Sequence, residues 1–451
     1  MLKKLPVLLS ALILFLTSVS ATGTQQKDNA LLIGGRQEIV KRMMQRFIAQ
    51  KNPARTMTSQ TLATQAIATY YEIGTYPGGT WANINDINDS GVVVGSGDIL
   101  GGWTRPIGVP LLGPNAWQWF DLGLFNNASP DMTGGCSEIS DAGMIVGYAA
   151  TEQGYLHAFA WMPKSGTQKV DLGTLKLDGL DTYDTSSFAS GVNRDGTFIV
   201  GCSRTDDASN PGSLVGMQTP VVWTPTVVRK AGKPVTVWKI NQLPTGGMEQ
   251  PGFILGVTLN VWSAITVNNK GQIIGVACEG SKWPARVVVV WNPLPGGKTW
   301  EIMSLPLPTG FPYAEVTDIN NKGEAVGTVA DSAAGSVSQN FHAALWKPID
   351  SLRRTYSLTL LPTLTGAPNP NVAFGINDLG DIVGNDYNAG GWGIDARWST
   401  NDPTFVQAIG IAGYESFGWA WKVNNQGIAV GVHYDQSDGF SVAHQAAVKF
   451  R

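Results

Sequence analysis

The chain repeats one pattern of hydrophobic and polar positions seven times between residues 87 and 431. Each copy has a β-branched residue, an Asn (Ser140 in the second copy), two variable residues and a Gly, and it closes on a second Gly four positions later, or five in the third copy. The copies begin at Ile87, Ile139, Val192, Val267, Ile319, Ile376 and Val423, and they close at Gly95, Gly147, Gly201, Gly275, Gly327, Gly384 and Gly431. Successive copies lie 47 to 75 residues apart, and such a period indicates a repeat architecture.

Each copy predicts a β-hairpin. Asn and Asp side chains bond to their own backbone, and Gly adopts a positive φ without steric cost. β-Branched runs such as 92–94 and 273–274 supply the flanking strands. Calcium binding through the Asn and Asp side chains is the alternative, but the pairs Asn269-Lys270 and Asn425-Gln426 carry no carboxylate. The pattern therefore favours a turn.

Two further segments follow most copies. An alternating segment ends in Trp at Trp161, Trp223, Trp291, Trp346 and Trp398. A short Asp-Leu-Gly segment comes next, at residues 120–123 and 170–174. A unit of four short strands cannot bury both of its faces alone. Radial packing of seven such units predicts an all-β chain folded as a seven-bladed β-propeller.

The two ends of the chain predict how the ring closes. The seventh copy stops after its third strand, residues 444–450, beside the C-terminus. The segment Tyr70–Thr75 is similar to the Asp-Leu-Gly-Thr segments and directly precedes the first hairpin. We therefore predict that this N-terminal strand completes the last blade, which removes exposed strand edges, and that the propeller spans residues 70–451.

The residues before the propeller predict export. Lys3 and Lys4, an apolar run over 5–16 and the small residues before position 22 are typical of a signal peptide at 1–21. The run is too short to span a membrane, and no later segment supplies ~20 apolar residues, so we expect a secreted or periplasmic protein without a transmembrane segment. Residues 22–69 form an extension with a short helix at 37–50, where apolar residues recur at helical spacing.

Composition excludes some functions. The chain has 31 basic and 34 acidic residues, so it lacks the excess of positive charge that nucleic-acid binding needs. Cys136, Cys202 and Cys278 are odd in number and lack zinc-ligand spacing, which predicts buried small side chains rather than a disulfide framework. We expect a monomer that uses no metal or cofactor.

Catalytic motifs are mostly missing from the sequence. It contains no Gly-x-Ser-x-Gly, His-Glu-x-x-His or Walker motif. His157, His342 and His444 fall at equivalent repeat positions, which predicts packing or hydrogen bonding within blades. His433 lies outside that register, and the sequence identifies no partner for it. We predict no catalytic residue.

A ring of loop residues is the better candidate for binding. In a propeller, the loops between second and third strands open on one face. Every copy places an acidic residue there: Asp98, Glu152, Asp206, Glu279, Asp331, Asp386 and Asp435. Six copies add an aromatic residue: Trp103, Tyr155, Trp283, Phe341, Trp392 and Phe440. Aromatic faces stack on sugars or cations and carboxylates accept hydrogen bonds from hydroxyls, although polar loop tips and core-covering aromatics are also ordinary features.

The segment His157–Phe159 carries a family resemblance. It lies between the hairpin at Ile139–Gly147 and the Asp-Leu-Gly-Thr-Leu segment at 171–175. In this order the chain resembles bacterial extracellular proteins with HAF repeats, over roughly residues 70–451. Only the second copy matches fully; the segments at 342–344 and 444–446 match in part. The resemblance implies secretion and a repeat scaffold, and it implies no reaction.

Three functions remain open at this point. The leading one is non-catalytic binding of an extracellular or envelope glycan or protein across the loop face. The second is a propeller hydrolase or lyase with acidic residues at the central channel. The third is a purely structural surface protein. Two carboxylates converging in a pocket would favour glycosidic chemistry, and separated shallow sites would favour binding.

Overall fold

The computed structural model describes residues 69–450 and leaves out a set of short segments. These are 100–103, 127, 130–131, 164–168, 177–182, 208–209, 231, 246–260, 279–286, 332–339, 367–369, 388–392, 410–416 and 435–442. For 206–207, 210–217, 230, 261, 278, 417, 434 and 443 it gives the backbone alone. The described part contains strands and no helix, and none of it forms a helix long and apolar enough to cross a membrane. The predicted signal peptide and the predicted helix at 37–50 lie outside the described residues.

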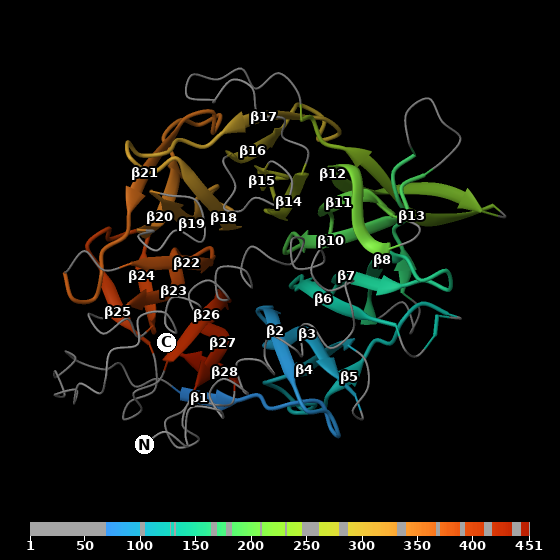
Figure 1. Ribbon diagram of the computed structural model, residues 1–451, viewed down its shortest axis with the longest axis horizontal. Helices are drawn as coiled ribbons and strands as arrows, with labels where there is room; N and C mark the ends of the chain where they lie inside the picture. The colour runs from blue at the N-terminus through green and yellow to red at the C-terminus, as the bar shows by residue number, and fades with distance from the viewer. Residues whose placement is uncertain are drawn as a thin grey trace.

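The strands form seven blades arranged around a central axis (Figure 1). Blade one has β2 (Ala82–Ile87), β3 (Val92–Asp98), β4 (Thr104–Pro110) and β5 (Phe120–Asp121). Blade two has β6 (Gly134–Ile139), β7 (Ile145–Ala150), β8 (Leu156–Trp161) and β9 (Val170–Asp171). Blade three has β10 (Ser186–Val192), β11 (Ile199–Asp207), β12 (Asn210–Lys230) and β13 (Lys233–Gln242). Blade four has β14 (Val261–Val267), β15 (Ile273–Cys278), β16 (Val287–Pro293) and β17 (Trp300–Ser304).

The remaining three blades follow the same order. Blade five has β18 (Tyr313–Ile319), β19 (Ala325–Ala330), β20 (Phe341–Pro348) and β21 (Tyr356–Leu360). Blade six has β22 (Asn371–Ile376), β23 (Asp381–Tyr387), β24 (Gly393–Ser399) and β25 (Val406–Ala408). Blade seven has β26 (Phe417–Val423), β27 (Ile428–Tyr434), β28 (Ala443–Lys449) and, from the other end of the chain, β1 (Thr69–Glu72). The predicted seven-bladed all-β fold is confirmed.

The ring closes through β1, as the sequence predicts. β1 pairs antiparallel with β28, with Tyr71 opposite Ala447, and Ile73 N donates to the carbonyl oxygen of Gln445 at 2.8 Å. His444 lies 3.3 Å from Glu72, and the second blade contains the equivalent pair, His157 with Asp171 at 2.9 Å. β1 therefore occupies the place that the Asp-Leu-Gly strand takes in another blade.

All seven inner strands contain a β-bulge at the same place, shortly before the hairpin turn. A bulge inserts one unpaired residue and reorients the side chains that follow it. The residues directly after the bulges are Asp86, Glu138, Gly191, Thr266, Asp318, Gly375 and Lys422. Five of these seven carry a polar side chain, in strands whose other residues supply the hydrophobic core.

Hydrophobic residues of neighbouring blades pack against each other, and Trp residues of the third strands add hydrogen bonds between the blades. Ile274 and Val290 of blade four, for example, share one cluster with Val316 and Ala344 of blade five. The indole nitrogens of four buried Trp residues each donate to a carbonyl oxygen of the preceding blade, over 2.7–2.9 Å. The pairs are Trp223 with Leu172, Trp291 with Pro244, Trp346 with Pro306 and Trp398 with Pro362. The recurrent Trp is thus a link between blades.

Candidate functional site

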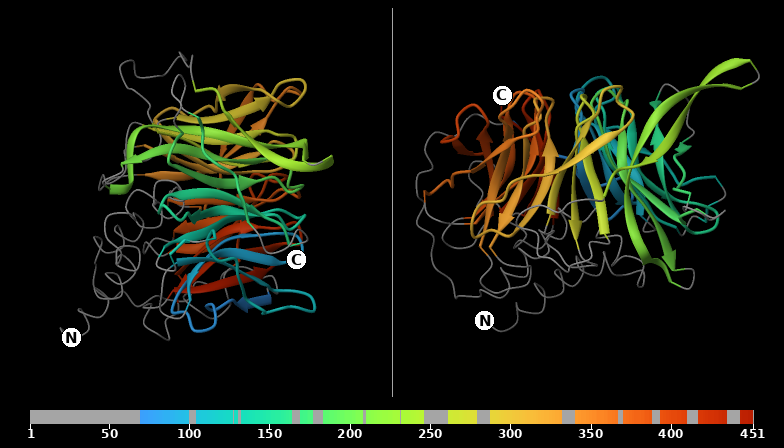
Figure 2. Two further views of the ribbon diagram at one scale, coloured as in Figure 1. Left: turned by 90° about the vertical axis from the view of Figure 1, so that its right-hand side faces the viewer. Right: turned by 90° about the horizontal axis from the view of Figure 1, so that it is seen from above.

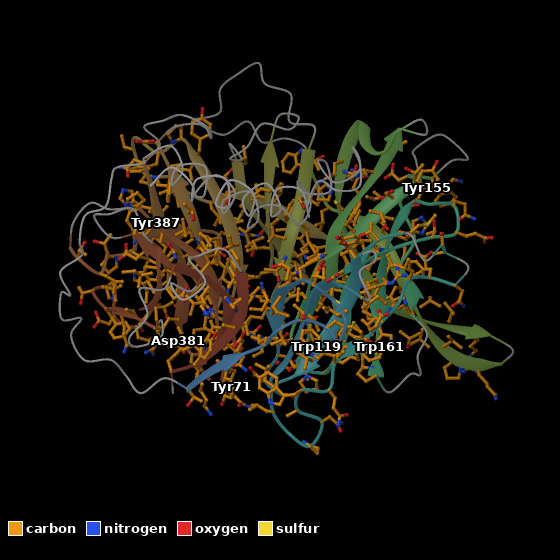
Figure 3. All side chains as sticks on the ribbon, turned by 60° about the horizontal axis from the view of Figure 1, so that its bottom comes forward. Tyr71, Trp119, Tyr155, Trp161, Asp381 and Tyr387 are labelled. Atoms are coloured by element: carbon orange, nitrogen blue, oxygen red, sulfur yellow. The ribbon has the colours of Figure 1, made fainter. Side chains whose placement is uncertain are left out.

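The structure describes some residues of the predicted loop ring, and their environments differ. Glu152 and Asp331 are exposed and Tyr155 is half-buried. Asp98, Asp386 and Phe341 are buried. Tyr155 directly precedes β8, and Trp161 is its last residue. Figure 3 shows the two residues on opposite sides of the molecule. Only the backbone of Asp206 is described, and Trp103, Glu279, Trp283, Trp392, Asp435 and Phe440 lie outside the described residues.

The two buried carboxylates of this ring hold the connections between blades. Asp98 Oδ1 accepts hydrogen bonds from the backbone nitrogens of Thr80 (2.7 Å) and Trp81 (2.8 Å). Asp386 accepts from the backbone nitrogens of Leu364 and Tyr387, and burial raises the pKa of its carboxyl to about 6. Asp98 and Asp386 therefore have a structural role: each fixes the segment that leads into the first strand of its own blade.

The aromatic residue Phe341 is part of the core between blades five and six. Its ring makes an edge contact with Tyr387 at 6.0 Å, and only 8% of the residue is exposed. Tyr155, by contrast, remains partly accessible beside the exposed Glu152 of the same loop. Glu152 and Tyr155 therefore put an exposed carboxylate and a partly accessible aromatic ring on one loop.

A second polar site, which the sequence analysis missed, fills the central axis. Lys422 Nζ of blade seven lies 2.5 Å from Glu138 Oε1 of blade two and 3.0 Å from Asp318 Oδ1 of blade five. The three side chains are only 7–8% exposed. Because these blades lie far apart around the ring, the contacts place all three side chains at its centre. Buried charges of this kind are tolerated only when they are paired and hydrogen-bonded.

The remaining oxygens of these carboxylates are also used. Glu138 Oε2 accepts from Val192 N and from Thr266 Oγ1, both at 2.8 Å, and Asp318 Oδ2 accepts from Ile376 N at 3.0 Å. Glycine at position 191 leaves the necessary room, because a Cβ there would meet the Thr266 Cα at 2.6 Å. Each carboxylate therefore joins its own blade to the next one and to Lys422.

Asp86 completes the axial group. Its Oδ2 accepts from Ile139 N at 2.9 Å, in the same way that Asp318 accepts from Ile376 N. Burial raises the pKa of Asp86 to about 7 against the opposing charge of Lys422, and the nearby Glu138 raises it further. The raised pKa favours the protonated, neutral form of the Asp86 carboxyl at this buried position.

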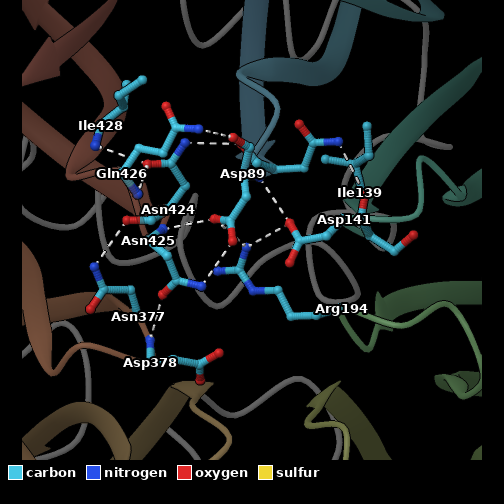
Figure 4. A network of polar contacts seen from close by, with 12 residues as sticks. Asp89, Ile139, Asp141, Arg194, Asn377, Asp378, Asn424, Asn425, Gln426 and Ile428 are labelled. Carbon is cyan, nitrogen blue, oxygen red and sulfur yellow. Dashed lines mark hydrogen bonds and ion pairs between the residues drawn. The ribbon is translucent and has the colours of Figure 1, made fainter.

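The hairpin turns form two rings of hydrogen bonds around the same axis (Figure 4). In the first ring, the signature Asn side chains of five blades donate to the carbonyl oxygen of the equivalent residue in the next blade, for example Asn377 to Asn424 and Asn424 to Asn88, both at 2.9 Å. In the second ring, the following residue accepts from the backbone of the preceding blade, as Asp89 Oδ1 accepts from Asn425 N at 2.8 Å. The signature residues therefore connect blades as well as forming turns.

Arg194 enters this second ring from blade three, where the other copies have Asp or Asn. Its Nη1 lies 3.2 Å from Asp141 Oδ1 and 3.5 Å from Asp89 Oδ1 (Figure 4). Burial acts to lower the pKa of Arg194, but Asp141, Asp86 and Asp89 outweigh it and raise the pKa. Arg194 thus places a permanent positive charge among the hairpin turns, at one end of the central axis.

Two histidines of the closing blade, His433 and His444, lie next to each other. His433, which had no partner in the sequence analysis, is 8% exposed and lies 3.1 Å from the Tyr70 hydroxyl of β1, and its ring stacks on His444. Beside it, a cavity of about 20 Å³, enough for one water molecule, also touches Asp395. Burial alone raises the pKa of Asp395 to about 7.

The described residues offer little for metal or thiol chemistry. No group of three or more His, Cys, Asp or Glu side chains among them is arranged to hold a metal ion. Cys136 and Cys202 are buried thiols that form no disulfide within the described residues, and burial raises the pKa of the Cys136 thiol, which keeps it protonated. The side chain of Cys278 lies outside the described residues.

Sequence signals for the axial site exist, but they are weak. Its members stand two positions before the signature Asn, at a place where the seven copies carry five different residue types. Only the shared bulge and the closure of the ring bring these different residues together. A charged residue such as Lys422 within an apolar inner strand is the one local sign of that site.

Comparison with known proteins assigns the chain to no family. No protein-family model and no curated protein matches the chain. Among solved structures, the sialidase of Trypanosoma rangeli in complex with sialic acid is 11% identical, with a TM-score of 0.35 over 82% of this chain and 54% of that chain. A putative TolB from Agrobacterium tumefaciens is 10% identical, with a TM-score of 0.35 over 65% of this chain and 88% of that chain.

A prolyl endopeptidase structure is 11% identical to this chain, with a TM-score of 0.46 over 82% of this chain and 50% of that chain. The chain spans about half the length of the sialidase and endopeptidase chains that it matches. The resemblance to HAF-repeat proteins therefore rests on the sequence motifs alone.

Proposed function

We propose that the chain is an exported, non-catalytic binding scaffold for a glycan or protein ligand of the envelope or the extracellular space. The observation that carries this proposal is the filled axis, where Lys422 is bonded to Glu138 and Asp318. With the centre occupied by structural ion pairs, the outer faces are the surfaces left for a ligand. We place the ligand on the face formed by the loops between second and third strands.

The exposed Glu152 and the half-buried Tyr155 support this placement, because they put a carboxylate and an aromatic ring on one loop. The equivalent aromatic residues Trp103, Trp283 and Trp392 belong to the same proposal by sequence position. Stacking aromatics often dominate a binding interface. The signal-peptide pattern at 1–21 supports a secreted or periplasmic location for this activity.

A glycan array probed with the labelled mature chain tests this proposal. Tyr155→Ala, and the triple replacement of Trp103, Trp283 and Trp392 by Ala, are expected to reduce binding at least tenfold while leaving the melting temperature nearly unchanged. Trp117→Ala is the matched control, because this Trp is 44% exposed and follows the third strand of blade one at the opposite face. Unchanged binding by both loop variants, or equal loss in the control, would contradict the proposed face.

A hydrolase or lyase with acids at the channel is the second candidate, and Asp86 is the observation that favours it. A carboxyl with a pKa of about 7 is matched to general acid catalysis near neutral pH. However, Asp86 is 5% exposed, and its Oδ2 is occupied by Ile139 N. If this candidate is right, Asp86→Asn abolishes turnover of arrayed polysaccharides; if the scaffold proposal is right, no Asp86-dependent turnover is measured.

A further inference from the structure

Blade three carries a two-stranded arm that extends beyond the propeller. β11 last pairs with β12 at Trp223, opposite Ile199, whereas β13 continues to pair with β12 as far as Lys230 opposite Lys233. Residues 224–230 and 233–239 therefore pair as a hairpin without a third strand, and Figure 2 shows it reaching past the other blades. The wide spacing between the third and fourth sequence repeats is consistent with this extra length.

The arm is basic in a chain that is otherwise acidic. Arg229, Lys230, Lys233 and Lys239 lie in it, and no Asp or Glu occurs between residues 208 and 248. The whole chain has a net charge of −3, so the arm is a local concentration of positive charge. The residues Arg229, Lys233 and Lys239 are exposed.

The arm also exposes apolar side chains on both faces. Cross-strand partners share a face, so Val235 lies beside Val228 on one face, and Val227 lies on the other. Val227 is 68% exposed and Val235 is 37% exposed. A two-stranded hairpin gains little stability from such side chains when they remain in water. Val227 and Val235 therefore leave apolar area in contact with water beside the basic side chains of the same hairpin.

We propose that this arm, defined as residues 224–239, binds an anionic lipid surface. Exposed lysines approach the lipid phosphates, and the valines enter the boundary between headgroups and acyl chains. A purely polyanionic partner, such as a soluble acidic polysaccharide, would need the charge but would gain nothing from Val227 and Val235. The combination of both side-chain types on a projecting hairpin favours lipid.

Sedimentation of the full mature chain with lipid vesicles tests this proposal. The chain is expected to bind vesicles containing about 30 mol% phosphatidylglycerol and to remain in solution with phosphatidylcholine alone. Binding should weaken strongly at about 0.5 M salt, because exposed charges are screened there. Replacing Lys233 and Lys239 by Gln should weaken binding roughly 30-fold, as expected for two basic residues at an anionic surface.

Two further variants make the test specific. Replacing Lys298 and Lys322, which are exposed elsewhere, by Gln removes the same charge and should leave vesicle binding unchanged. Replacing Val227 and Val235 by Ser should weaken vesicle binding at least threefold without changing retention on dextran sulfate. Absent binding to phosphatidylglycerol, equal loss in the Lys298 and Lys322 control, or no effect of the valine variant would each overturn the proposal; in the last case the arm would bind a soluble polyanion.

Discussion

The buried charges of this chain differ in how well their surroundings satisfy them. Glu138 at the axis contacts Lys422, Val192 N and Thr266, so that both of its oxygens are bonded. In blade six, Asp395 Oδ1 is buried and accepts no hydrogen bond among the described residues. An unsatisfied buried carboxylate costs free energy when it is ionised, whereas a fully bonded one does not necessarily do so.

This difference predicts a pH-dependent stability at Asp395. Burial raises its pKa from 3.8 to about 7, so the native state holds its proton more tightly than the unfolded chain does. Stability from this group is therefore present below about pH 4 and is lost as the pH rises to about 7. Asp395→Asn removes this loss. We expect the variant to gain stability relative to the parent between about pH 5 and pH 8, measured by urea unfolding; parallel pH profiles for both proteins would contradict this.

At the scale of single strands and hairpins, much of the fold can be predicted from the sequence. The hairpin signature identifies the two inner strands of each blade. Gly is required where φ is positive, as at Gly91 and Gly271 with φ of 76° and 74°, and the signature Asn side chain accepts a hydrogen bond within its own turn, as Asn88 Oδ1 does from Val92 N. The Trp-ended strand and the closing strand at Tyr70–Thr75 follow from alternation and from the incomplete seventh copy. These features are local, and local chemistry specifies them.

What the sequence does not reveal depends on neighbours that are distant in the chain. The partner of Asn424 is Asn88, 336 residues away, and the partner of Lys422 is Glu138, 284 residues away. The same limit applies to the predicted binding ring. Spacing places Asp98 and Glu152 in equivalent loops, but only the folded chain shows that Asp98 bonds to Thr80 N while Glu152 is exposed.

The closing strand β1 gives a prediction at this scale. Tyr70 and Glu72 contact His433 and His444, and the backbone of β1 covers the edge of β28. Deleting residues 22–66 keeps β1 and is expected to leave solubility and melting temperature unchanged. Deleting residues 22–78 exposes the unpaired edge of β28, which promotes aggregation. Equal melting temperatures and equal solubility for the two truncations would show that β1 does not stabilise the closed ring.

At the scale of the whole molecule, the axial ion group supplements the contacts between adjacent blades. The Trp links and the Asn rings join each blade only to its neighbours. Lys422 instead joins blade seven to blades two and five across the centre. The ring thus has one set of contacts along its circumference and another through its axis, and the second set involves buried charge.

This arrangement predicts a specific loss and a specific recovery. Lys422→Met leaves Glu138 and Asp318 buried without their cation, and breaking a buried pair in this way costs about 3–5 kcal/mol of unfolding free energy. Adding Glu138→Gln and Asp318→Asn to Lys422→Met should recover part of that loss, because the amides carry no charge and their oxygens can still accept from Val192 N and Ile376 N. Urea unfolding of the parent, the single variant and the triple variant at neutral pH measures both effects. If the triple variant is less stable than Lys422→Met alone, the axial carboxylates stabilise the ring independently of Lys422, and the cross-axis pairing does not account for their presence.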